Sequence, residues 1–383
     1  MMRYILLLLF LTFQQPNFDK VGVHLLLDDG RNHWDQSYWV EHLAYAGMMS
    51  GDGGIAVQVI TLDHLNPQYW QPFIDLSVEN NLTPVIRIAT TFDAAHGFWK
   101  PPQPDTNGYY TTLANRYAAF INALDWHGVS PHIILLNEPN NGHEWGGRPN
   151  PAAYAYFLVD AASVLKATVP DVVILNGAID LYAPDTGNLP FPSSDLHFIN
   201  ASNFMDGMVA AVPDVFEWVD VWSSHPYSMG SFTAPPWERA YHFDSIHDAP
   251  LVTLTPPDGI TNRGINGYEW ELWKLSTYGV ESLPIMITEA GWRHSGGGDA
   301  QYPSPEQVTA YLDMAMLGNV DGRYPDAPRS GWIPWLLDER VIGIALFALN
   351  GTSQEWSHTT YLILDDAGHV LDTYPMFDLL AGY

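Results

Sequence analysis

Eight short apolar runs recur along the 383-residue chain, and most are followed by a loop and then a helix-like segment. Most of the runs are continuous stretches of β-branched residues and leucine, as expected for parallel strands that are buried on both faces. The runs are Val21–Leu27, Ile55–Ile60, Pro84–Ala89, His132–Leu136, Val172–Leu175, Val219–Ser223, Ile285–Thr288 and Ile342–Leu349. This pattern predicts an α/β fold, a (β/α)8 TIM barrel with a single domain and long βα loops. The alternative is a doubly wound open sheet, but no glycine-rich phosphate fingerprint follows the first run.

Four segments between these runs have apolar residues at helical spacing. They are Tyr110–Trp126, Pro151–Thr168, Gly267–Tyr278 and Ser304–Leu317, the last of which opens with a Ser-Pro-Glu helix-start signal. Residues 361–369 predict a β-hairpin turn before a final helix.

The N-terminal residues include a short apolar run that precedes the first predicted strand. We divide the chain into an N-terminal apolar segment, residues 1–19, and a barrel domain, residues 20–383. The run Tyr4–Phe13 is far shorter than the ~20 residues of a membrane-spanning helix. Its length suits a secretory signal, but no small-residue cleavage site follows it, so a strand or turn packed under the domain is the other interpretation. Export to the periplasm or medium and retention in the cytoplasm both stay open.

Charge and composition limit the partners. The chain has 43 acidic and 15 basic residues, a formal net charge of -28, and no cysteine. This acid excess disfavours nucleic acid and anionic membranes, because both need basic patches. Without cysteine, disulfides, thiolate metal sites and cysteine nucleophiles are excluded.

Motifs for metal and serine chemistry are weak. The His143-Glu144 pair lacks the second histidine of a zinc protease, and neither Asp28–Gly30 nor Asp365-Asp366 matches a calcium-binding loop. The sequence has no G-x-S-x-G nucleophile elbow. We therefore expect neither a metal nor a cofactor.

Two glutamates stand at the ends of apolar runs. Glu138 ends Ile133–Glu138, and Glu289 lies in Pro284–Trp292. A charge at the end of a buried strand is costly unless it is paired, hydrogen-bonded or functional. In a barrel the strand ends converge on one mouth, so the two carboxyl groups can face each other and have different pKa values. That arrangement is the requirement for glycoside hydrolysis.

These residues occur in motifs that resemble the clan A retaining glycoside hydrolases, with families 5 and 39 the nearest. The motifs are Asn137-Glu138-Pro139 at the fourth run, His225-Pro226-Tyr227 at the sixth and Thr288–Trp292 at the seventh. The resemblance covers nearly the whole chain and implies a carbohydrate substrate.

Roles follow from the resemblance residue by residue. It implies that Glu138 is the general acid/base and Glu289 the nucleophile. Asn137 would bind the 2-hydroxyl of the sugar, and Tyr227 would donate to Glu289, with His225 beside it. Arg87 matches the arginine that often pairs with the nucleophile, although an ion pair inside the barrel is the alternative for this residue.

One departure concerns the floor of the sugar site. Many relatives have a tryptophan at the end of the eighth strand, whereas this chain has Phe347 there and its nearest tryptophan is Trp356. Either ring could form the floor.

Long segments after the third, sixth and seventh runs carry aromatic residues that would border the barrel mouth. These are Phe98, Trp99, Trp237, Tyr241, Phe243, Trp292 and Tyr302. A single aromatic residue more often packs than binds, but together they suggest platforms for the apolar faces of a ligand. Glu144, Asp93 and Glu355 are rival carboxylates in nearby loops.

The sequence thus predicts hydrolysis of β-glycosidic bonds in a neutral polysaccharide or oligosaccharide. A carbohydrate-binding barrel without turnover and a transglycosylase are the alternatives. The identity of the sugar, endo or exo action and the oligomeric state are not determined by the sequence.

Overall fold

The computed structural model describes residues 16–30, 33–51, 53–186, 196–242, 255–298, 301–351 and 356–383. The predicted run Tyr4–Phe13, together with Phe243 and Glu355, lies outside these ranges. Within the described ranges, no helix is both long and apolar enough to cross a membrane.

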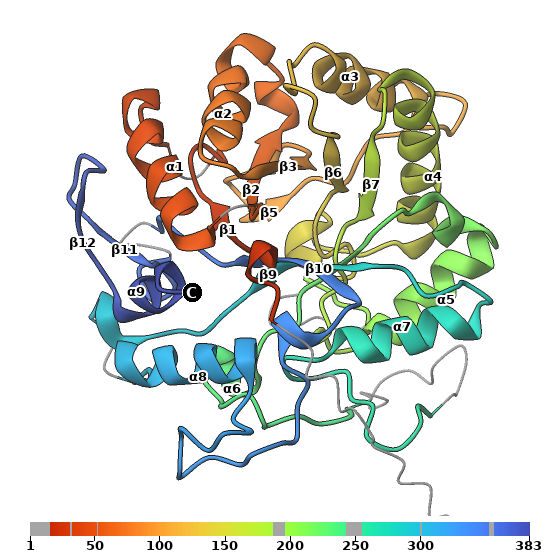
Figure 1. Ribbon diagram of the computed structural model, residues 1–383. Coiled ribbons are helices and arrows are strands. Elements are labelled where there is room, and N and C mark those ends of the chain that lie inside the picture. Colours follow the sequence, from red (N-terminus) through yellow and green to blue (C-terminus); the bar gives the residue numbers. More distant parts are fainter. Residues whose placement is uncertain are drawn as a thin grey trace, which may run out of the picture.

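Eight parallel strands form the centre of the molecule, and Figure 1 shows helices surrounding them. The strands are β1 (Val21–Leu25), β2 (Ile55–Thr61), β3 (Thr83–Ala89), β6 (His132–Leu135), β7 (Val173–Asn176), β8 (Trp222–Ser224), β9 (Ile285–Ala290) and β10 (Val341–Leu346). They pair in the order β7-β6-β3-β2-β1-β10-β9-β8. A parallel bridge between Leu175 and Val221 joins the two edges. The predicted (β/α)8 barrel is confirmed, with each predicted run supplying one strand.

The helices that alternate with the strands include the four that were predicted. They are α1 (Gln36–Ser50), α2 (Pro67–Glu79), α3 (Thr111–Asn122), α4 (Pro151–Thr168), α5 (Ala201–Ala211), α7 (Tyr268–Thr277) and α8 (Pro305–Leu317). The predicted start of α8 is confirmed, because the Ser304 side chain caps it by accepting from the Gln307 amide.

Shorter strands and helices lie outside the eight-stranded sheet. The tail has the predicted hairpin, antiparallel strands β11 (Leu362–Leu364) and β12 (Val370–Thr373), before helix α9 (Pro375–Ala381). A second antiparallel pair, β4 (Phe92–Asp93) and β5 (Phe98–Trp99), follows β3. The remaining short elements are α6 (Met229–Phe232) and the 3-10 helices Phe18–Lys20, Leu62–His64, Gly142–Glu144, Val215–Trp218, Ser295–Gly297 and Trp335–Leu337.

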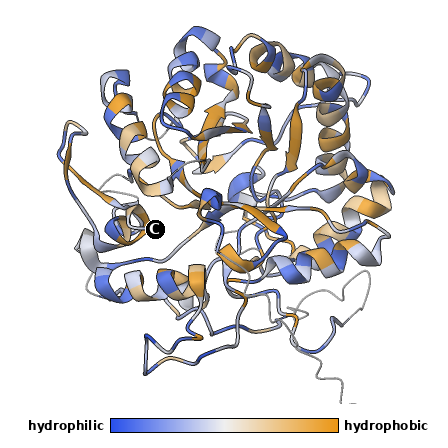
Figure 2. Ribbon diagram, in the orientation of Figure 1, coloured by the Kyte–Doolittle hydropathy of each residue, from blue (hydrophilic) through white to orange (hydrophobic). Residues whose placement is uncertain are grey.

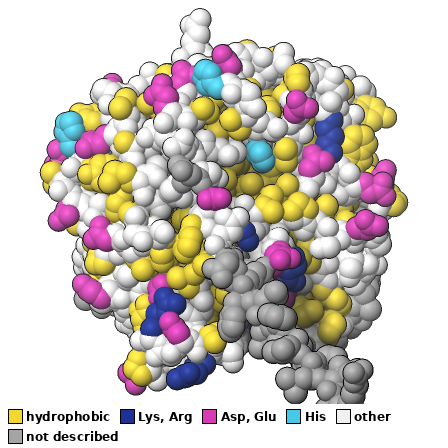
Figure 3. Space-filling model, in the orientation of Figure 1, with side chains coloured by type: hydrophobic (Ala, Val, Ile, Leu, Met, Phe, Trp, Pro, Cys, Tyr) yellow, Lys and Arg dark blue, Asp and Glu magenta, His cyan; other side chains and the backbone are white. Residues whose placement is uncertain are grey.

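The hydrophobic core has two layers. One fills the barrel with side chains from successive strands, namely Ile55, Val57, Val85, Ile134, Leu175, Val221, Met286 and Ala345. The other lies between the strands and the helices, where Figure 2 shows hydrophobic colour along the strands. Close packing requires Gly22 in β1, because a Cβ there would lie 2.2 Å from the Ile55 carbonyl oxygen. On the face that Figure 3 shows, acidic side chains are scattered among other residues.

A buried ion pair ties α5 to α7. Lys274 Nζ lies 2.8 Å from Asp206 Oδ1, and the two side chains are 1% and 2% exposed. Replacing Asp206 with alanine leaves the Lys274 ammonium group buried without this ion-pair partner. We therefore expect the free energy of unfolding to fall by about 3–5 kcal/mol. Urea denaturation measures this change. The matched control is Lys166→Ala, which removes a partly exposed pair with Asp220 and is expected to cost about 0–1 kcal/mol. Equal losses in both variants would contradict the prediction.

A second buried acidic side chain lies on the helix that carries Lys274. Glu271 in α7 is fully buried and accepts a hydrogen bond from Ser224 Oγ. Burial raises its pKa from 4.5 to about 7, while the hydrogen bond from Ser224 opposes the shift.

This raised pKa predicts a dependence of stability on pH. The unfolded chain releases the Glu271 proton near pH 4.5, whereas the folded chain keeps it to about pH 7. Stability is therefore greatest below the unfolded pKa and falls as pH rises through the folded one, by up to about 3 kcal/mol from this group. We expect Glu271→Gln, which is neutral throughout, to lose less stability than the wild type between pH 5 and pH 8. The same change in the free energy of unfolding from pH 5 to pH 8 in the wild type and in Glu271→Gln would contradict this.

Candidate active site

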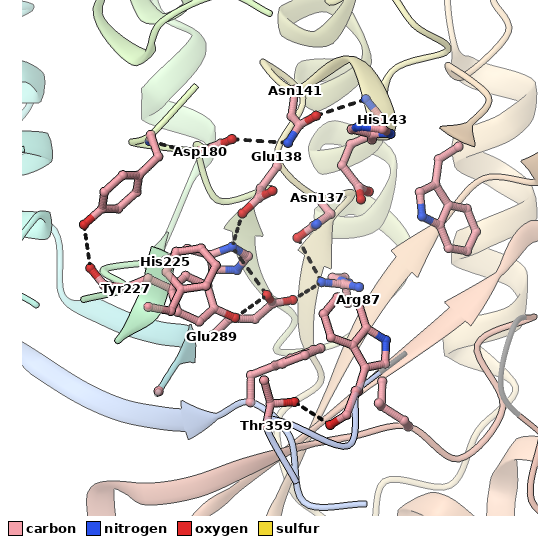
Figure 4. Close-up of a pocket in the computed structure, with 18 of the residues that line it drawn as sticks. Arg87, Asn137, Glu138, Asn141, His143, Asp180, His225, Tyr227, Glu289 and Thr359 are labelled. Atoms are coloured by element: carbon pink, nitrogen blue, oxygen red, sulfur yellow. Dashed lines mark hydrogen bonds and ion pairs between the residues drawn. The ribbon is translucent and has the colours of Figure 1, made fainter. Parts of the chain in front are cut away.

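One cavity of about 700 Å³ opens at the carboxyl ends of the barrel strands. All ten residues that the sequence placed in the site line it, namely Arg87, Trp99, Asn137, Glu138, His225, Tyr227, Glu289, Trp292, Phe347 and Trp356. They come from loops or strand ends after β3, β6, β8, β9 and β10, which converge because parallel strands end on the same face. Figure 4 shows how the polar members point toward one another.

Glu138 follows β6 on an unusual stretch of backbone. Leu136 has φ 71° and Glu138 has φ 33°, a region that non-glycine residues seldom occupy. The surrounding contacts hold this turn: the Glu138 carbonyl accepts from the Asn141 amide at 2.8 Å, and Glu138 Oε1 lies 2.8 Å from His225 Nδ1. Burial, together with the negative charge of Asp180, raises the pKa of Glu138 to about 7, although the contact with His225 opposes this shift.

Glu289, at the end of β9, has partners of the opposite kind. Its Oε1 accepts from Arg87 Nη1, and its Oε2 accepts from the Tyr227 hydroxyl at 3.0 Å. Burial alone would raise the pKa of Glu289, but the positive charges of His225 and Arg87 outweigh it and hold the pKa at about 2. At neutral pH the Glu289 carboxyl group is therefore ionised, whereas the Glu138 carboxyl group can still hold a proton.

His225 lies between the two glutamates. Its Nδ1 is 2.8 Å from Glu138 Oε1 and 3.8 Å from Glu289 Oε2. Its Nε2 lies 3.1 Å from the Thr288 hydroxyl, so both ring nitrogens are engaged. Burial opposes protonation of the ring, but the charge of Glu289 and the hydrogen bond with Glu138 raise the pKa of His225.

Arg87 connects the nucleophile candidate to the residue before the acid candidate. Its Nη1 donates to Glu289 and, at 2.9 Å, to Asn137 Oδ1. The side chain of Arg87 is 8% exposed, so its charge acts in a region of low dielectric constant. With its oxygen fixed by Arg87, the Asn137 amide is oriented within the cavity.

Both candidates for the floor reach the cavity. The rings of Phe347 and Trp356 have centroids 5.0 Å apart and meet edge to face at 86°. Phe347 also packs on His24, with centroids 5.1 Å apart. The two rings therefore form one aromatic surface that lines the cavity.

The two predicted tryptophans are largely packed into the protein. Trp99 is 4% exposed and packs on Phe92. Trp292 donates its indole N–H to the Ala234 carbonyl at 2.7 Å and packs on Trp335. Each therefore contributes only a small area to the cavity.

Other predicted candidates lie elsewhere. Of the aromatic residues expected on the rim, Phe98, Trp237, Tyr241 and Tyr302 are not among those lining the cavity. Among the rival carboxylates, Glu144 lines the cavity, whereas Asp93 does not and lies 3.1 Å from His96. The charge and aromaticity of a loop residue do not fix the direction of its side chain.

Two of the aspartates considered for calcium have protein partners. Asp28 accepts from the Tyr69 hydroxyl at 2.9 Å, and Asp365 caps a turn by accepting the amides of Ala367 and Gly368. In the part of the chain that the structure describes, no group of three or more histidine and acidic side chains could hold a metal ion.

Several cavity residues were missed by sequence reasoning. They are Leu26, Asn141, Asp180, Tyr182, Phe232 and Thr359, while His24 lies just behind the cavity, 3.7 Å from Glu289 Oε1. Asp180 follows the fifth apolar run, so a search for charged residues after every strand could have found it. His24 is inside the first run, where a histidine gives no signal until strand register is known.

Comparison with known proteins supports the fold. No protein-family model and no curated sequence matches the chain. A β-glucosidase from Exiguobacterium marinum has a TM-score of 0.52 and 15% identity, covering 91% of this chain and 87% of its own. A double mutant of the β-glucosidase from Trichoderma harzianum has a TM-score of 0.51 and 14% identity, covering 95% and 97%. The chain spans 44% of the length of an FMN-binding β-glucuronidase from Facaelibacterium prausnitzii L2-6, with a TM-score of 0.49 and 11% identity over 96% of this chain. The predicted resemblance in fold to glycoside hydrolases is confirmed.

Proposed function

We propose that the protein is a retaining glycoside hydrolase that cleaves β-glycosidic bonds through a glycosyl-enzyme intermediate. The observation that carries this proposal is that the pKa values of two glutamates in one cavity are shifted in opposite directions. Glu138 has its pKa raised to about 7, and Glu289 has its pKa lowered to about 2. A proton donor beside an ionised nucleophile is what double displacement requires.

The separation of the two carboxyl groups supports retention. Because His225 Nδ1 lies 2.8 Å from Glu138 Oε1 and 3.8 Å from Glu289 Oε2, these oxygens are no farther apart than the sum of those distances. Retaining enzymes have carboxyl groups about 5–5.5 Å apart and inverting enzymes about 6.5–9.5 Å. An oxygen-to-oxygen distance within that bound is compatible with the retaining separation.

The proposed chemistry has two steps. Glu138 gives its proton to the glycosidic oxygen, which departs with the bonding electrons while a Glu289 oxygen forms an ester with the anomeric carbon. Glu138, now ionised, then takes a proton from water as the water oxygen attacks that carbon and the ester bond breaks. Tyr227 and Arg87 would hold Glu289 in position, and Asn137 would bind the sugar 2-hydroxyl.

A neutral sugar is the substrate that the cavity supports. Its lining includes four carboxyl groups, from Glu138, Glu144, Asp180 and Glu289, which disfavour a polyanion. The aromatic surface of Phe347 and Trp356 suits the apolar face of a pyranose ring. The two β-glucosidases that share the fold add support for a β-linked substrate.

A substrate screen tests the proposal. We expect hydrolysis of at least one member of a panel of β-glucans, mannan, xylan and aryl β-glycosides, with NMR showing the β-anomer as the first product. A first product in the α configuration would overturn retention. Binding without turnover would instead favour a carbohydrate-binding barrel, and transfer to an added sugar in preference to water would indicate a transglycosylase.

A further inference from the structure

We infer that Asp180 recognises the sugar on the leaving-group side of the scissile bond, so that the natural substrates are saccharides rather than aryl or alkyl glycosides. This inference rests on the proposed function, because it takes Glu138 as the acid. Its basis is the placement of Asp180 in the cavity and the way the chain fixes its carboxylate.

Asp180 is held rigidly from several directions. Its Oδ1 accepts the backbone amides of Tyr182 at 2.8 Å and Ala183 at 3.1 Å, and its Oδ2 accepts from Asn141 Nδ2 at 3.2 Å. The Asn140 side chain also accepts from the Asp180 amide at 2.8 Å and donates to the Asp180 carbonyl. Asn140 and Asn141 therefore hold the loop after β7 against the segment that follows Glu138.

The position of Asp180 is on the leaving-group side. Figure 4 shows Asp180 and Asn141 on the side of Glu138 away from Glu289. The nucleophile attacks one side of the anomeric carbon while the acid protonates the oxygen that departs on the other. A group beyond Glu138 thus faces the departing sugar.

The surroundings of Asp180 suit a polyhydroxylated ligand. A carboxylate accepts up to four hydrogen bonds, and three donors from the protein leave capacity for a sugar hydroxyl. Tyr182 and Phe232 line the same cavity, with ring centroids 6.0 Å apart. A hydrogen-bond acceptor beside aromatic surface is a combination that binds the polar edge and the apolar face of a sugar. An aryl leaving group would use the rings but not the carboxylate.

The test compares leaving groups in one variant. Because the charge of Asp180 also raises the pKa of Glu138, the comparison uses the pH-independent kcat/KM on the acid side of the pH profile, where Glu138 is protonated in both proteins. There we expect Asp180→Asn to lower kcat/KM for a β-linked disaccharide by about 30-fold, as for a lost hydrogen bond to a charged group, while kcat/KM for the 4-nitrophenyl glycoside of the same sugar changes less than about 3-fold. The asparagine oxygen can still accept the two backbone amides, and thermal unfolding checks that the variant is folded.

The matched control is Asp185→Asn. Asp185 is a buried aspartate in the same loop that accepts from Asn200 and Asn203 and is not among the residues lining the cavity. We expect it to alter stability without altering the ratio of the two kcat/KM values. Equal losses on both substrates in Asp180→Asn, or the same change of ratio in Asp185→Asn, would overturn the assignment of Asp180 and leave the proposed function intact. A wild-type protein that hydrolyses neither substrate class would overturn both.

Discussion

Replacing Glu289 with glycine is expected to lower hydrolysis of an aryl β-glycoside by at least about 10⁴-fold, the scale typical of removing a nucleophile. The structure supplies the reason. Glu289 is the carboxylate that Arg87 and Tyr227 contact directly, and it is ionised at neutral pH because its pKa is about 2. No other group in the described cavity has both features.

Added azide is expected to restore part of the activity of Glu289→Gly. In Glu289→Gly the anion can enter the vacated space and attack the anomeric carbon, which recovers part of the lost rate and yields the α-glycosyl azide. The control is Glu271→Gln, a substitution at another buried glutamate that lies between a strand and a helix, and this variant is expected to keep its activity. Activity that survives in Glu289→Gly, or rescue that gives the β-azide, would contradict the role of Glu289.

The second large effect concerns Glu138. In the proposed mechanism, replacing it with alanine removes general acid catalysis, so we expect kcat/KM for a disaccharide to fall by about 10²–10⁴-fold. A 2,4-dinitrophenyl glycoside has a leaving group that needs no proton, and its bond-cleavage step, followed as the release of dinitrophenol in the first turnover, should change far less. Azide should here give the β-glycosyl azide, because the covalent intermediate at Glu289 still forms. Equal losses for both leaving groups would contradict the assignment.

The same residue sets the expected pH profile. In the proposed mechanism Glu138 must be protonated for the first step, and its pKa of about 7 reflects burial and Asp180, opposed by His225, with Glu289 as the remaining nearby charge. We expect kcat/KM for a disaccharide to fall about tenfold per pH unit above neutrality, whereas the acid limb, set by Glu289, lies far below it. In Glu138→Gln the alkaline limb should disappear. An unchanged limb in that variant would assign it to another group.

Much of the fold could be read from local patterns. Each of the eight apolar runs became a strand because continuous β-branched stretches suit strands buried on both faces. Their ends shifted by a few residues: the sixth strand begins at Trp222 rather than Val219, and a 3-10 helix over residues 215–218 precedes it.

The site could be predicted where its residues belong to motifs at strand ends. Glu138 and Glu289 were placed by that logic, and the cavity they share follows from the barrel. Rim aromatics such as Trp237 and Tyr302 were not placed correctly, because loop direction depends on long-range packing. Trp237 packs on Trp332 instead of facing the cavity.

By itself the sequence determined the barrel, the two glutamates at its mouth and the classes of partner that the acid excess disfavours. These features depend on local periodicity, strand-end position and composition, which need no knowledge of contacts. The resemblance implied the roles of the two glutamates, but only the tertiary structure decided the physical cause of their different pKa values, because these values depend on burial and on charges brought from distant strands, Asp180 beside Glu138 and Arg87 beside Glu289. It likewise decided that Asp180 and His24 belong to the site, since their proximity arises only when the strands close into a barrel.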